Sequence, residues 1–288
     1  MSLFSVVRGY NILMIILAQY LASIYILSPN LPLRQVVFDV NLFLIVTASA
    51  LVIAAGYIIN NFYDAEKDLI NKPTKSILDR LVSQRFKLTT YFLLNFSAIF
   101  LASYISFKAV LFFSTYVFGI WLYSHKLKRI PLFGNMISAI LAIAPFFVVF
   151  VYYKNFETVI FVHALFLFLL ILARELIKDL ENMAGDLAQN YKTLPVIYGT
   201  KTSKVIVAFL AVLTLIPALL LINYFDVGYM YIYFNLSILL LIVFMFLLWK
   251  AKKKKDYVWL HNILKLIIIS GVFSILLIDV NLVLNRIL

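Results

Sequence analysis

The chain has 288 residues, of which 64% are hydrophobic and 13% charged, and its formal net charge is +12. Soluble proteins are usually about 45–50% apolar and about 25% charged, so this chain has too few polar residues to cover a soluble domain. It has no cysteine, and its three histidines, His125, His163 and His261, are scattered, which excludes disulfides and thiolate chemistry and leaves no histidine metal-ligand pattern. The composition therefore predicts a polytopic membrane protein.

Nine segments are long and apolar enough to cross a bilayer, which takes roughly 20 mainly apolar residues per helix. Backbone groups in hydrocarbon must be paired within their own segment, so each span is predicted to be a helix and the fold all-α. In chain order the expected spans are about 10–28, 41–62, 88–107, 109–124, 131–152, 156–174, 204–222, 229–249 and 261–283. We expect them to form one domain that covers residues 1–288.

Basic residues are distributed unevenly between the two sides of this predicted bundle. The N-terminal residues and the loops after the second, fourth, sixth and eighth spans share one side, and they hold 20 of the 25 lysine and arginine residues. Basic loops stay in the cytoplasm, so we expect these parts to be cytoplasmic and the C-terminus to lie on the other side of a cell inner membrane. Topology and attraction to anionic membrane lipids explain the net charge, and nothing in the sequence indicates nucleic-acid binding.

Two acidic stretches follow the second and sixth spans, on the expected cytoplasmic side. The first reads NNFYDAEKD, from Asn60 to Asp68, and the second reads ELIKDLENMAGD, from Glu175 to Asp186. With Asp79, they contain eight of the 13 acidic residues. Carboxylates concentrated at two helix ends of an apolar chain indicate a site for hard cations.

The spacing of the oxygen-bearing residues in each stretch is helical. Residues three or four positions apart lie on one face of a helix, so each stretch presents one polar face. Two such faces converging from two helices can hold Mg²⁺ through one or two oxygens each, with water and phosphate oxygens completing the coordination. A cation would also relieve the repulsion between the carboxylates. The residues concerned are Asn60, Asn61, Asp64 and Asp68 in the first stretch, and Asp179, Asn182 and Asp186 in the second.

Basic residues surround both acidic stretches in the sequence. Lysine binds phosphate as a point charge, and arginine binds it with a bidentate fork. Acidic motifs, Mg²⁺ and basic residues at the polar mouth of an apolar bundle together predict a pocket for an isoprenoid diphosphate, with its tail among apolar side chains. The basic residues are Lys72, Lys75, Lys126, Lys128, Arg174, Lys178 and Lys192.

At these residues the chain resembles the UbiA superfamily of intramembrane prenyltransferases. The family's first motif, Asn-Asp-x-x-Asp-x-x-x-Asp, is matched from residue 60 to 68, with Asn61 in place of the first Asp. Its second motif, Asp-x-x-Asp-x-x-x-Asp, is matched from residue 179 to 186, with Asn182 in place of the middle Asp. Further similar segments are Arg8-x-x-Asn11, INKP (70–73), YSHKLKR (123–129), Gly134–Asn135 and KTLP (192–195).

Within the superfamily, DAEKDLINKP and RELIKDLENMAGD are most similar to the branch that acts on geranylgeranylglyceryl phosphate and makes the second ether bond of archaeal-type lipids. After INKP that branch usually continues with Arg-Pro and a Pro-Ser-Gly turn, whereas this chain reads TKSILDRLVS, with Lys75 in place of the Arg. Each Asn that replaces an Asp keeps a carbonyl oxygen for Mg²⁺ but removes one negative charge.

The resemblance implies a nine-helix bundle, Mg²⁺ as the cofactor, and an isoprenoid diphosphate, a lipophilic acceptor and membrane lipids as partners. It implies catalysis by Asp64, Asp68, Asp179 and Asp186, and metal binding by these four together with Asn60, Asn61 and Asn182. The resemblance and the basic residues around the motifs together give the expected substrate-binding set. It consists of Arg8, Asn11, Asn60, Lys72, Lys75, Tyr123, Lys126, Lys128, Arg174, Lys178 and Lys192.

The hypothesis for the chemistry is metal-assisted ionisation of the allylic diphosphate, followed by capture of the allylic cation by the acceptor. Geranylgeranyl diphosphate and geranylgeranylglyceryl phosphate are the favoured substrates. An aromatic acceptor in quinone or haem biosynthesis is the first alternative. A transporter or a non-catalytic membrane scaffold is the second, although a transporter would favour charged residues and broken helices near the middle of the membrane.

Overall fold

The computed structural model describes residues 6–279, apart from the side chains of Lys75 and Leu78. Over this range nine helical segments are long and apolar enough to cross a membrane, so the predicted all-α, nine-span architecture is confirmed. The spanning helices are α2 (Gly9–Ala22), extended by the π-helical η1 (Ser23–Leu27), α4 (Val40–Tyr63), α7 (Gln84–Ile105), α8 (Phe107–His125), α9 (Phe133–Tyr153), α10 (Thr158–Ala188), α11 (Leu194–Asn223), α12 (Tyr231–Lys250) and α13 (Lys254–Ser274). Shorter elements are α3 (Leu33–Val37), α5 (Ala65–Asn71), α6 (Pro73–Arg80), η2 (Leu127–Arg129), η3 (Gly228–Met230) and η4 (Ile275–Leu277).

Three spanning helices extend well beyond the predicted apolar runs. The α10 helix continues from the expected end at 174 to Ala188, through the whole second acidic stretch. The α11 helix begins ten residues before 204 and kinks at Gly199, whose φ of 79° favours glycine. The α13 helix begins at Lys254 rather than 261, and part of the expected span 261–283 lies outside the described residues. Hydropathy marks the hydrocarbon-spanning part of a helix, whereas backbone hydrogen bonding continues into the polar region.

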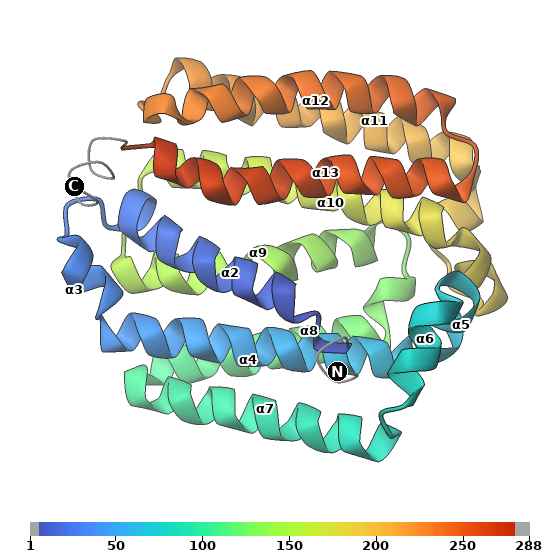
Figure 1. Cartoon of the computed structure of the whole chain (residues 1–288), viewed down its shortest axis with the longest axis horizontal. Helices are drawn as coiled ribbons and strands as arrows, with labels where there is room; N and C mark the ends of the chain where they lie inside the picture. Colours follow the sequence, from blue (N-terminus) through green and yellow to red (C-terminus); the bar gives the residue numbers. More distant parts are fainter. Residues whose placement is uncertain (1–5, 280–288) are drawn as a thin grey trace.

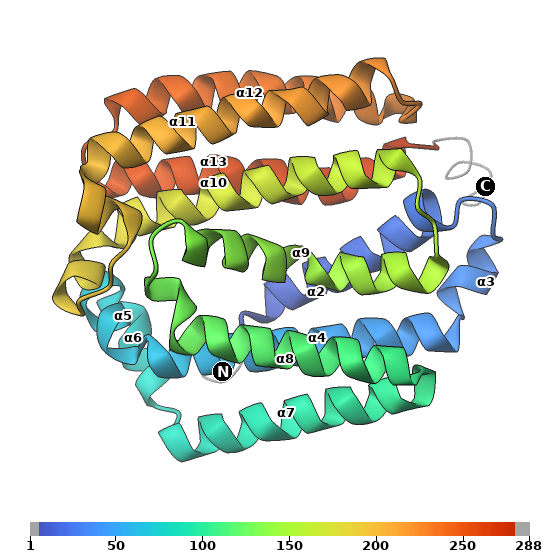
Figure 2. The same cartoon turned by 180° about the vertical axis from the view of Figure 1, so that it is seen from behind.

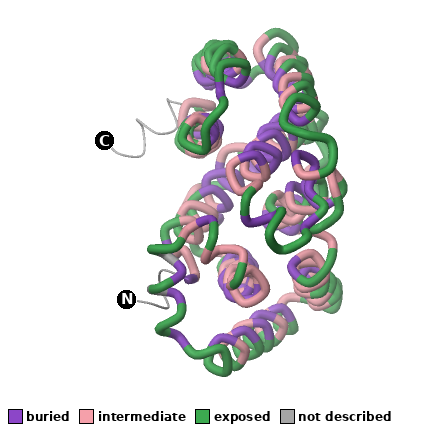
Figure 3. The backbone as a smooth tube through the Cα atoms, turned by 90° about the vertical axis from the view of Figure 1, so that its right-hand side faces the viewer, coloured by how far each residue is buried: buried purple, intermediate pink, exposed green. Residues whose placement is uncertain are grey.

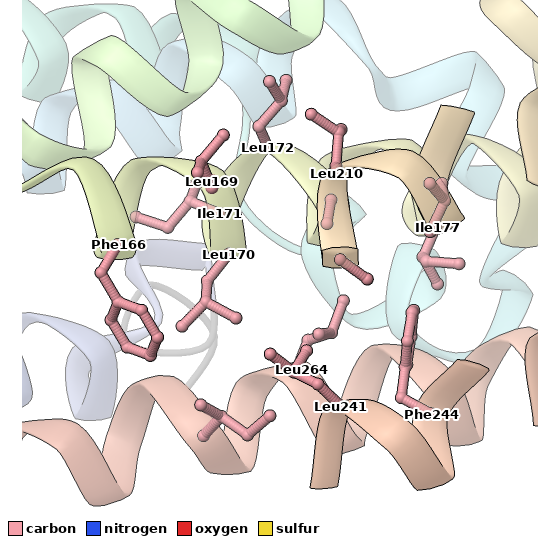
Figure 4. Packing of buried hydrophobic residues seen from close by; sticks show 14 of the residues in the cluster. Phe166, Leu169, Leu170, Ile171, Leu172, Ile177, Leu210, Leu241, Phe244 and Leu264 are labelled. Carbon is pink, nitrogen blue, oxygen red and sulfur yellow. The ribbon is translucent and has the colours of Figure 1, made fainter. Parts of the chain in front are cut away.

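The described helices form two packed groups with separate apolar cores. Buried residues of α2, α4, α7, α8 and α9 make one core, which includes Leu42 and Phe113. Buried residues of α10 to α13 make the other, in which Phe166, Leu170 and Ile177 of α10 pack with residues of the later helices (Figure 4). The helices run roughly side by side, with α7 at one edge and α11 and α12 at the other, and α2 and α9 are the members of the first group that lie next to α10 and α13 (Figures 1 and 2).

Many large apolar side chains face outward from the bundle. Phe96, Phe107 and Phe246 are 71%, 81% and 70% exposed. Exposed residues follow the outer sides of the helices, and buried residues follow the inner sides (Figure 3). An outer surface of this kind is stable in contact with lipid rather than with water.

Polar groups within the bundle are paired where a helix is interrupted. Pro145 inside α9 has no N–H, so it cannot bond to the carbonyl oxygen of Leu141, and the hydroxyl of Tyr116 donates to that oxygen instead, at 3.0 Å. The buried amide of Gln19 donates to the carbonyl oxygen of Pro145 at 2.7 Å. These bonds join α2 and α8 to α9 in an apolar setting where an unpaired carbonyl would be costly.

Asn71, the last residue of α5, connects the two acidic stretches. Its side chain accepts a hydrogen bond from the N–H of Gly185 at 3.1 Å and donates to the carbonyl oxygen of Asn182 at 3.2 Å. A Cβ atom on Gly185 would lie 2.3 Å from the amide nitrogen of Asn71, so only glycine allows this approach. Lys254 donates from α13 to the carbonyl oxygen of Asn71. The contact fixes α5 against α10 at the end of the bundle that carries α5 and α6, away from α3 (Figure 1).

This connection predicts a measurable loss of stability. Replacing Asn71 with Ala removes two hydrogen bonds to α10, and we expect the free energy of unfolding to fall by about 1–3 kcal/mol. Thermal unfolding of the purified protein in detergent measures the effect. Asn223→Ala is the matched control, because the exposed side chain of Asn223 donates only within its own helix, to Leu219. Equal melting temperatures for the two variants would contradict the role of Asn71.

Candidate functional site

A cavity of about 610 Å³ lies between the two packed groups of helices. Its walls include residues of α2, α4, α5, α8, α9, α10, α12 and α13, and the outer helices α7 and α11 contribute nothing to it. One part is lined by aromatic and aliphatic side chains, among them Phe146, Phe147, Phe161 and Phe166. Another part is lined by the acidic motifs and by basic residues. The cavity therefore joins an apolar chamber to a polar mouth.

Asp64 lies at the junction of α4 and α5, where it ends the first helix and begins the second. One of its carboxylate oxygens accepts from Lys128 of η2 at 2.7 Å and from the hydroxyl of Tyr191 at 3.3 Å. Lys128 also donates to the side-chain oxygen of Asn60 at 3.2 Å. The backbone at Leu127 and Lys128 packs closely against Gly134. A Cβ atom on Gly134 would lie 2.6 Å from the carbonyl oxygen of Leu127, so the absence of a side chain at Gly134 allows the backbone position from which Lys128 reaches Asp64.

The other residues of the first motif also line the cavity. The amide nitrogen of Asn61 donates to Asp79 at 2.8 Å, which ties α4 to α6, while the amide oxygen of Asn61 accepts no hydrogen bond. Asp68 lies one helical turn after Asp64, at the mouth.

The second motif lies on α10 and faces the first. Asp179 accepts a hydrogen bond from Asn135 at 2.8 Å, and Asn182 has a buried amide oxygen without a hydrogen-bond partner. Asp186 is 1% exposed and accepts from the hydroxyl of Thr193 at 3.3 Å. Asp179 and Asn182 line the cavity, whereas Asp186 lies just behind its wall.

Lys67 bridges the two motifs. Its ammonium nitrogen lies 3.6 Å from a carboxylate oxygen of Asp64 and 3.2 Å from one of Asp186. It also lies 4.6 Å from the ring centre of Tyr191, in cation–π contact. The guanidinium of Arg129 contacts the same ring at 4.8 Å. The ring of Tyr191 therefore stabilises, through cation–π contacts, the positive charges of Lys67 and Arg129 near Asp64.

These contacts determine the protonation states at the mouth. Burial alone would raise the pKa of Asp64, but Lys128 and Lys67 outweigh it and lower that pKa below its usual value. Burial alone would lower the pKa of Lys67, but Asp64 and Asp186 outweigh it and raise that pKa above its usual value. Asp64 and Lys67 are thus both charged at neutral pH.

A second basic group lines the cavity on the side of α2 and α10. It consists of Arg8, Lys72, Arg174 and Lys178. Burial lowers the pKa of Lys72, and the charges of Lys178 and Arg8 lower it further, against an opposing effect of Asp68. Glu175 partly balances the group, since it lies 2.7 Å from Lys178 and 3.5 Å from Arg174.

Other polar residues complete this side of the cavity. Asn11 donates to the hydroxyl of Tyr57 at 3.0 Å, and the guanidinium of Arg8 lies 5.4 Å from the ring centre of Tyr57. Tyr123 lines the cavity from α8, and Lys265 lines it from α13.

The donor set fits Mg²⁺. The buried amide oxygens of Asn61 and Asn182 accept no hydrogen bond, and the carboxylates of Asp64, Asp68 and Asp179 line the same cavity. Mg²⁺ prefers oxygen ligands and commonly takes only one or two from the protein, the rest being water and substrate phosphate. In the described part of the chain no three acidic, histidine or cysteine residues form a ready-made metal cluster, so phosphate oxygens would have to complete the coordination.

Three expected site residues lie outside the cavity wall. Lys126 and Lys192 are exposed and do not line the cavity. Lys126 directly follows the end of α8, and the η2 turn after it places Lys128 in the cavity wall instead. Lys192 follows Tyr191, and of these two residues Tyr191 is the buried one. Asp186 reaches the mouth only through Lys67. The side chain of Lys75 lies outside the described residues.

Sequence reasoning missed Lys67, Tyr191 and Asn71 as parts of the site. Lys67 occupies a variable position of the first motif, so no motif marks it. Tyr191 is one of 18 tyrosines in an aromatic-rich chain. The one available signal was position, because Lys67 lies inside the first acidic stretch and Tyr191 immediately precedes the KTLP segment.

The model of the UbiA prenyltransferase family matches residues 14–269. Digeranylgeranylglyceryl phosphate synthase of Methanobrevibacter smithii is 31% identical over 238 residues, which cover 78% of this chain and 80% of the relative. The synthase of the same name from Thermococcus sibiricus is 36% identical over 166 residues, or 57% of this chain and 59% of the relative.

Solved structures share the fold. A structure from a study of digeranylgeranylglyceryl phosphate synthase in membranes has a TM-score of 0.71 at 24% identity and covers 95% of this chain and 96% of its own. A UbiA homologue from Archaeoglobus fulgidus bound to GPP and Mg²⁺ has a TM-score of 0.69 at 16% identity, with 96% and 99% covered. The family match over most of the chain, the relatives and the nine-span bundle agree: this chain is an integral membrane protein that belongs to the UbiA prenyltransferase family.

Proposed function

We propose that this chain transfers a geranylgeranyl group from geranylgeranyl diphosphate to geranylgeranylglyceryl phosphate, with Mg²⁺, in ether lipid synthesis. The proposal rests on one observation above all. A single cavity joins an apolar chamber to a mouth where two acidic motifs face each other between two separate basic groups. The names of the relatives, digeranylgeranylglyceryl phosphate synthase, favour the same reaction, and we assign it to the single domain 1–288.

The mouth has the residues to activate a diphosphate leaving group. Lys128, held by Asn60 and Asp64, is placed to bind diphosphate oxygens. Mg²⁺ bound by Asp64, Asp68, Asp179 and the amide oxygens of Asn61 and Asn182 would neutralise negative charge as the diphosphate leaves. The breaking carbon–oxygen bond leaves its electron pair on the diphosphate, and fixed positive groups favour this separation of charge.

The apolar chamber serves the other half of the substrate. Phe146, Phe147 and Phe161 line it, and they exclude water from the allylic cation that forms when the diphosphate leaves. A hydroxyl oxygen of the acceptor then bonds to the allylic carbon, and the hydroxyl proton passes to the released diphosphate. Trapping a cation needs little basicity, so the reaction does not call for a strong general base in the cavity.

The second basic group supports a phosphorylated acceptor. Arg8, Lys72, Arg174 and Lys178 gather on one side of the cavity, and within the described part of the chain Glu175 is the carboxylate in ion-pair contact with this group. An excess of partly buried positive charge is stabilised by an anion, and the phosphate of geranylgeranylglyceryl phosphate supplies one. An aromatic acceptor for quinone or haem synthesis has no phosphate to bind these four basic side chains.

Orientation follows from the distribution of charge. We propose that the N-terminus, the mouth of the cavity and the basic loops face the cytoplasm across a cell inner membrane, with the C-terminus on the opposite side.

Removing one motif carboxylate tests the reaction. We expect Asp64→Asn to lower turnover by at least about 100-fold, because it removes a charge that holds both Lys128 and the metal. The assay follows ether-linked product by mass spectrometry with purified protein in detergent. Turnover should also stop on chelation with EDTA and return with Mg²⁺. Asp226→Asn, in an exposed loop, is the control, and an active Asp64→Asn protein would refute the assigned role.

A kinetic comparison tests the acceptor. We expect Lys178→Met to raise the KM for geranylgeranylglyceryl phosphate by about tenfold, or about 1.4 kcal/mol, and to leave the KM for geranylgeranyl diphosphate within about twofold, a difference of under 1 kcal/mol. Lys201→Met, at an exposed site, controls for the loss of charge. Turnover with dihydroxynaphthoate, hydroxybenzoate or haem, and none with the phosphoglycerol lipid, would keep the transferase chemistry and reject the acceptor.

The absence of cysteine makes the orientation testable by single-cysteine labelling. Lys255→Cys should be protected from a membrane-impermeant maleimide in intact cells and labelled after lysis, since Lys255 lies in the basic segment at the start of α13. Lys154→Cys, between α9 and α10, should be labelled in intact cells. The reverse pattern would invert the proposed topology.

A further inference from the structure

Lys67 occupies a position between the two acidic motifs that a divalent cation could otherwise take. Its ammonium lies 3.6 Å from Asp64 and 3.2 Å from Asp186, and these carboxylates come from different motifs. The Asp186 side chain is 1% exposed, its Oδ2 accepts from Thr193, and its Oδ1 faces Lys67 and has no other partner among the described residues. Lys67 is therefore the cation that pairs with Asp186. Lys67 lines the cavity and Asp186 does not, so the lysine side chain lies between Asp186 and the cavity.

The position of Lys67 is defined from several sides. Its side chain is 16% exposed, and the ring of Tyr191 lies 4.6 Å from its ammonium. Asp64 is one helical turn before it on the chain. On the other side, Asn71 holds α5 against α10, the helix that carries Asp186. A flexible surface lysine would have none of these constraints.

The two acidic motifs of this chain carry less negative charge than the family pattern, and Lys67 lowers that charge further. Asn61 and Asn182 stand where the family pattern has aspartate, and each removes one negative charge. Lys67 adds one positive charge at a position that the pattern leaves variable. The three residues together reduce the negative charge by three units, which exceeds the charge of one Mg²⁺. The mouth therefore needs less metal charge to become neutral.

We propose that Lys67 is a built-in cation that replaces a divalent ion between Asp64 and Asp186, so that this chain binds one divalent ion at its mouth and gains a second when Lys67 is removed. The inference rests on the proposed Mg²⁺-dependent function. The bound ion uses the oxygen ligands that line the cavity, namely Asn61, Asp64, Asp68, Asp179 and Asn182, and it shares Asp64 with Lys67. A lysine cannot exchange with solution ions, so the part of the charge compensation that Lys67 supplies is independent of magnesium concentration.

Mn²⁺ binding tests the inference without turnover. Mn²⁺ is added to the purified protein in detergent, with and without inorganic pyrophosphate, and free and bound Mn²⁺ are counted by electron paramagnetic resonance. We expect one bound Mn²⁺ per wild-type chain. We expect two in Lys67→Met, with dipolar broadening from a pair of ions about 4 Å apart, as in two-metal sites.

The controls separate charge from packing. Lys67→Arg keeps the positive charge and should bind one Mn²⁺, whereas Lys67→Gln should bind two if Lys67→Met does not fold. Lys255→Met, at an exposed position in the first turn of α13, should behave as wild type. Two ions bound to the wild-type chain, or one ion bound to the folded Lys67→Met or Lys67→Gln protein, would overturn the inference.

The outcomes also separate this inference from the proposed function. One ion in wild type and two in the variant, without prenyl transfer to the phosphoglycerol lipid, would support Lys67 as the built-in cation and reject the assigned reaction. Turnover with two ions in the wild type would support the reaction and reject the role of Lys67. No Mn²⁺ binding in either protein would reject both.

Discussion

Charged groups held at the end of an apolar helix bundle must be paired with one another, and much of this structure follows from that requirement. Removing a carboxylate or an ammonium from water costs several kcal/mol unless an opposite charge and hydrogen bonds compensate for it. Asp64 and Asp186 are compensated by Lys67, and Asp64 also by Lys128. These residues lie on three separate elements, so the pairing requires α5, η2 and α10 to meet at one place.

Neutral contacts provide the geometry that the charges need. Asn71 joins α5 to the backbone of α10, and Gly185 allows the close approach. Asn135 orients Asp179 from the start of α9, and Thr193 orients Asp186 from the segment before α11. Such bonds are directional, which ion pairs are not, so they determine where each carboxylate points. The acidic motifs are therefore positioned by amides, a hydroxyl and backbone groups as much as by their own helices.

The division of the bundle into two packed groups gives the cavity its two-part character. The interior of each group is filled by apolar side chains, and the space between the groups is left to the cavity. Its walls are apolar within the span of the helices and polar where α4 passes into α5 and where α10 extends past the apolar run. A substrate with an anionic head and an isoprenoid tail fits this arrangement, with the head at the polar mouth and the tail between the apolar walls. The same extension of α10 brings Arg174, Lys178 and Asp179 to one wall.

The sequence predicts the nine spans, the all-α class and the helical spacing within each acidic motif, because hydropathy and helical period are local properties of the chain. It could not determine which residues meet across the bundle. Tyr191 and Asp64 are 127 positions apart, and Lys128 and Asp64 are 64 apart. Lys126 and Lys128 are equivalent by composition, yet one is exposed and the other is bonded to Asp64, since the turn of η2 lies between them. Lys67 looked like one more basic residue near the membrane, and only the packing of α5 on α10 placed it between two carboxylates.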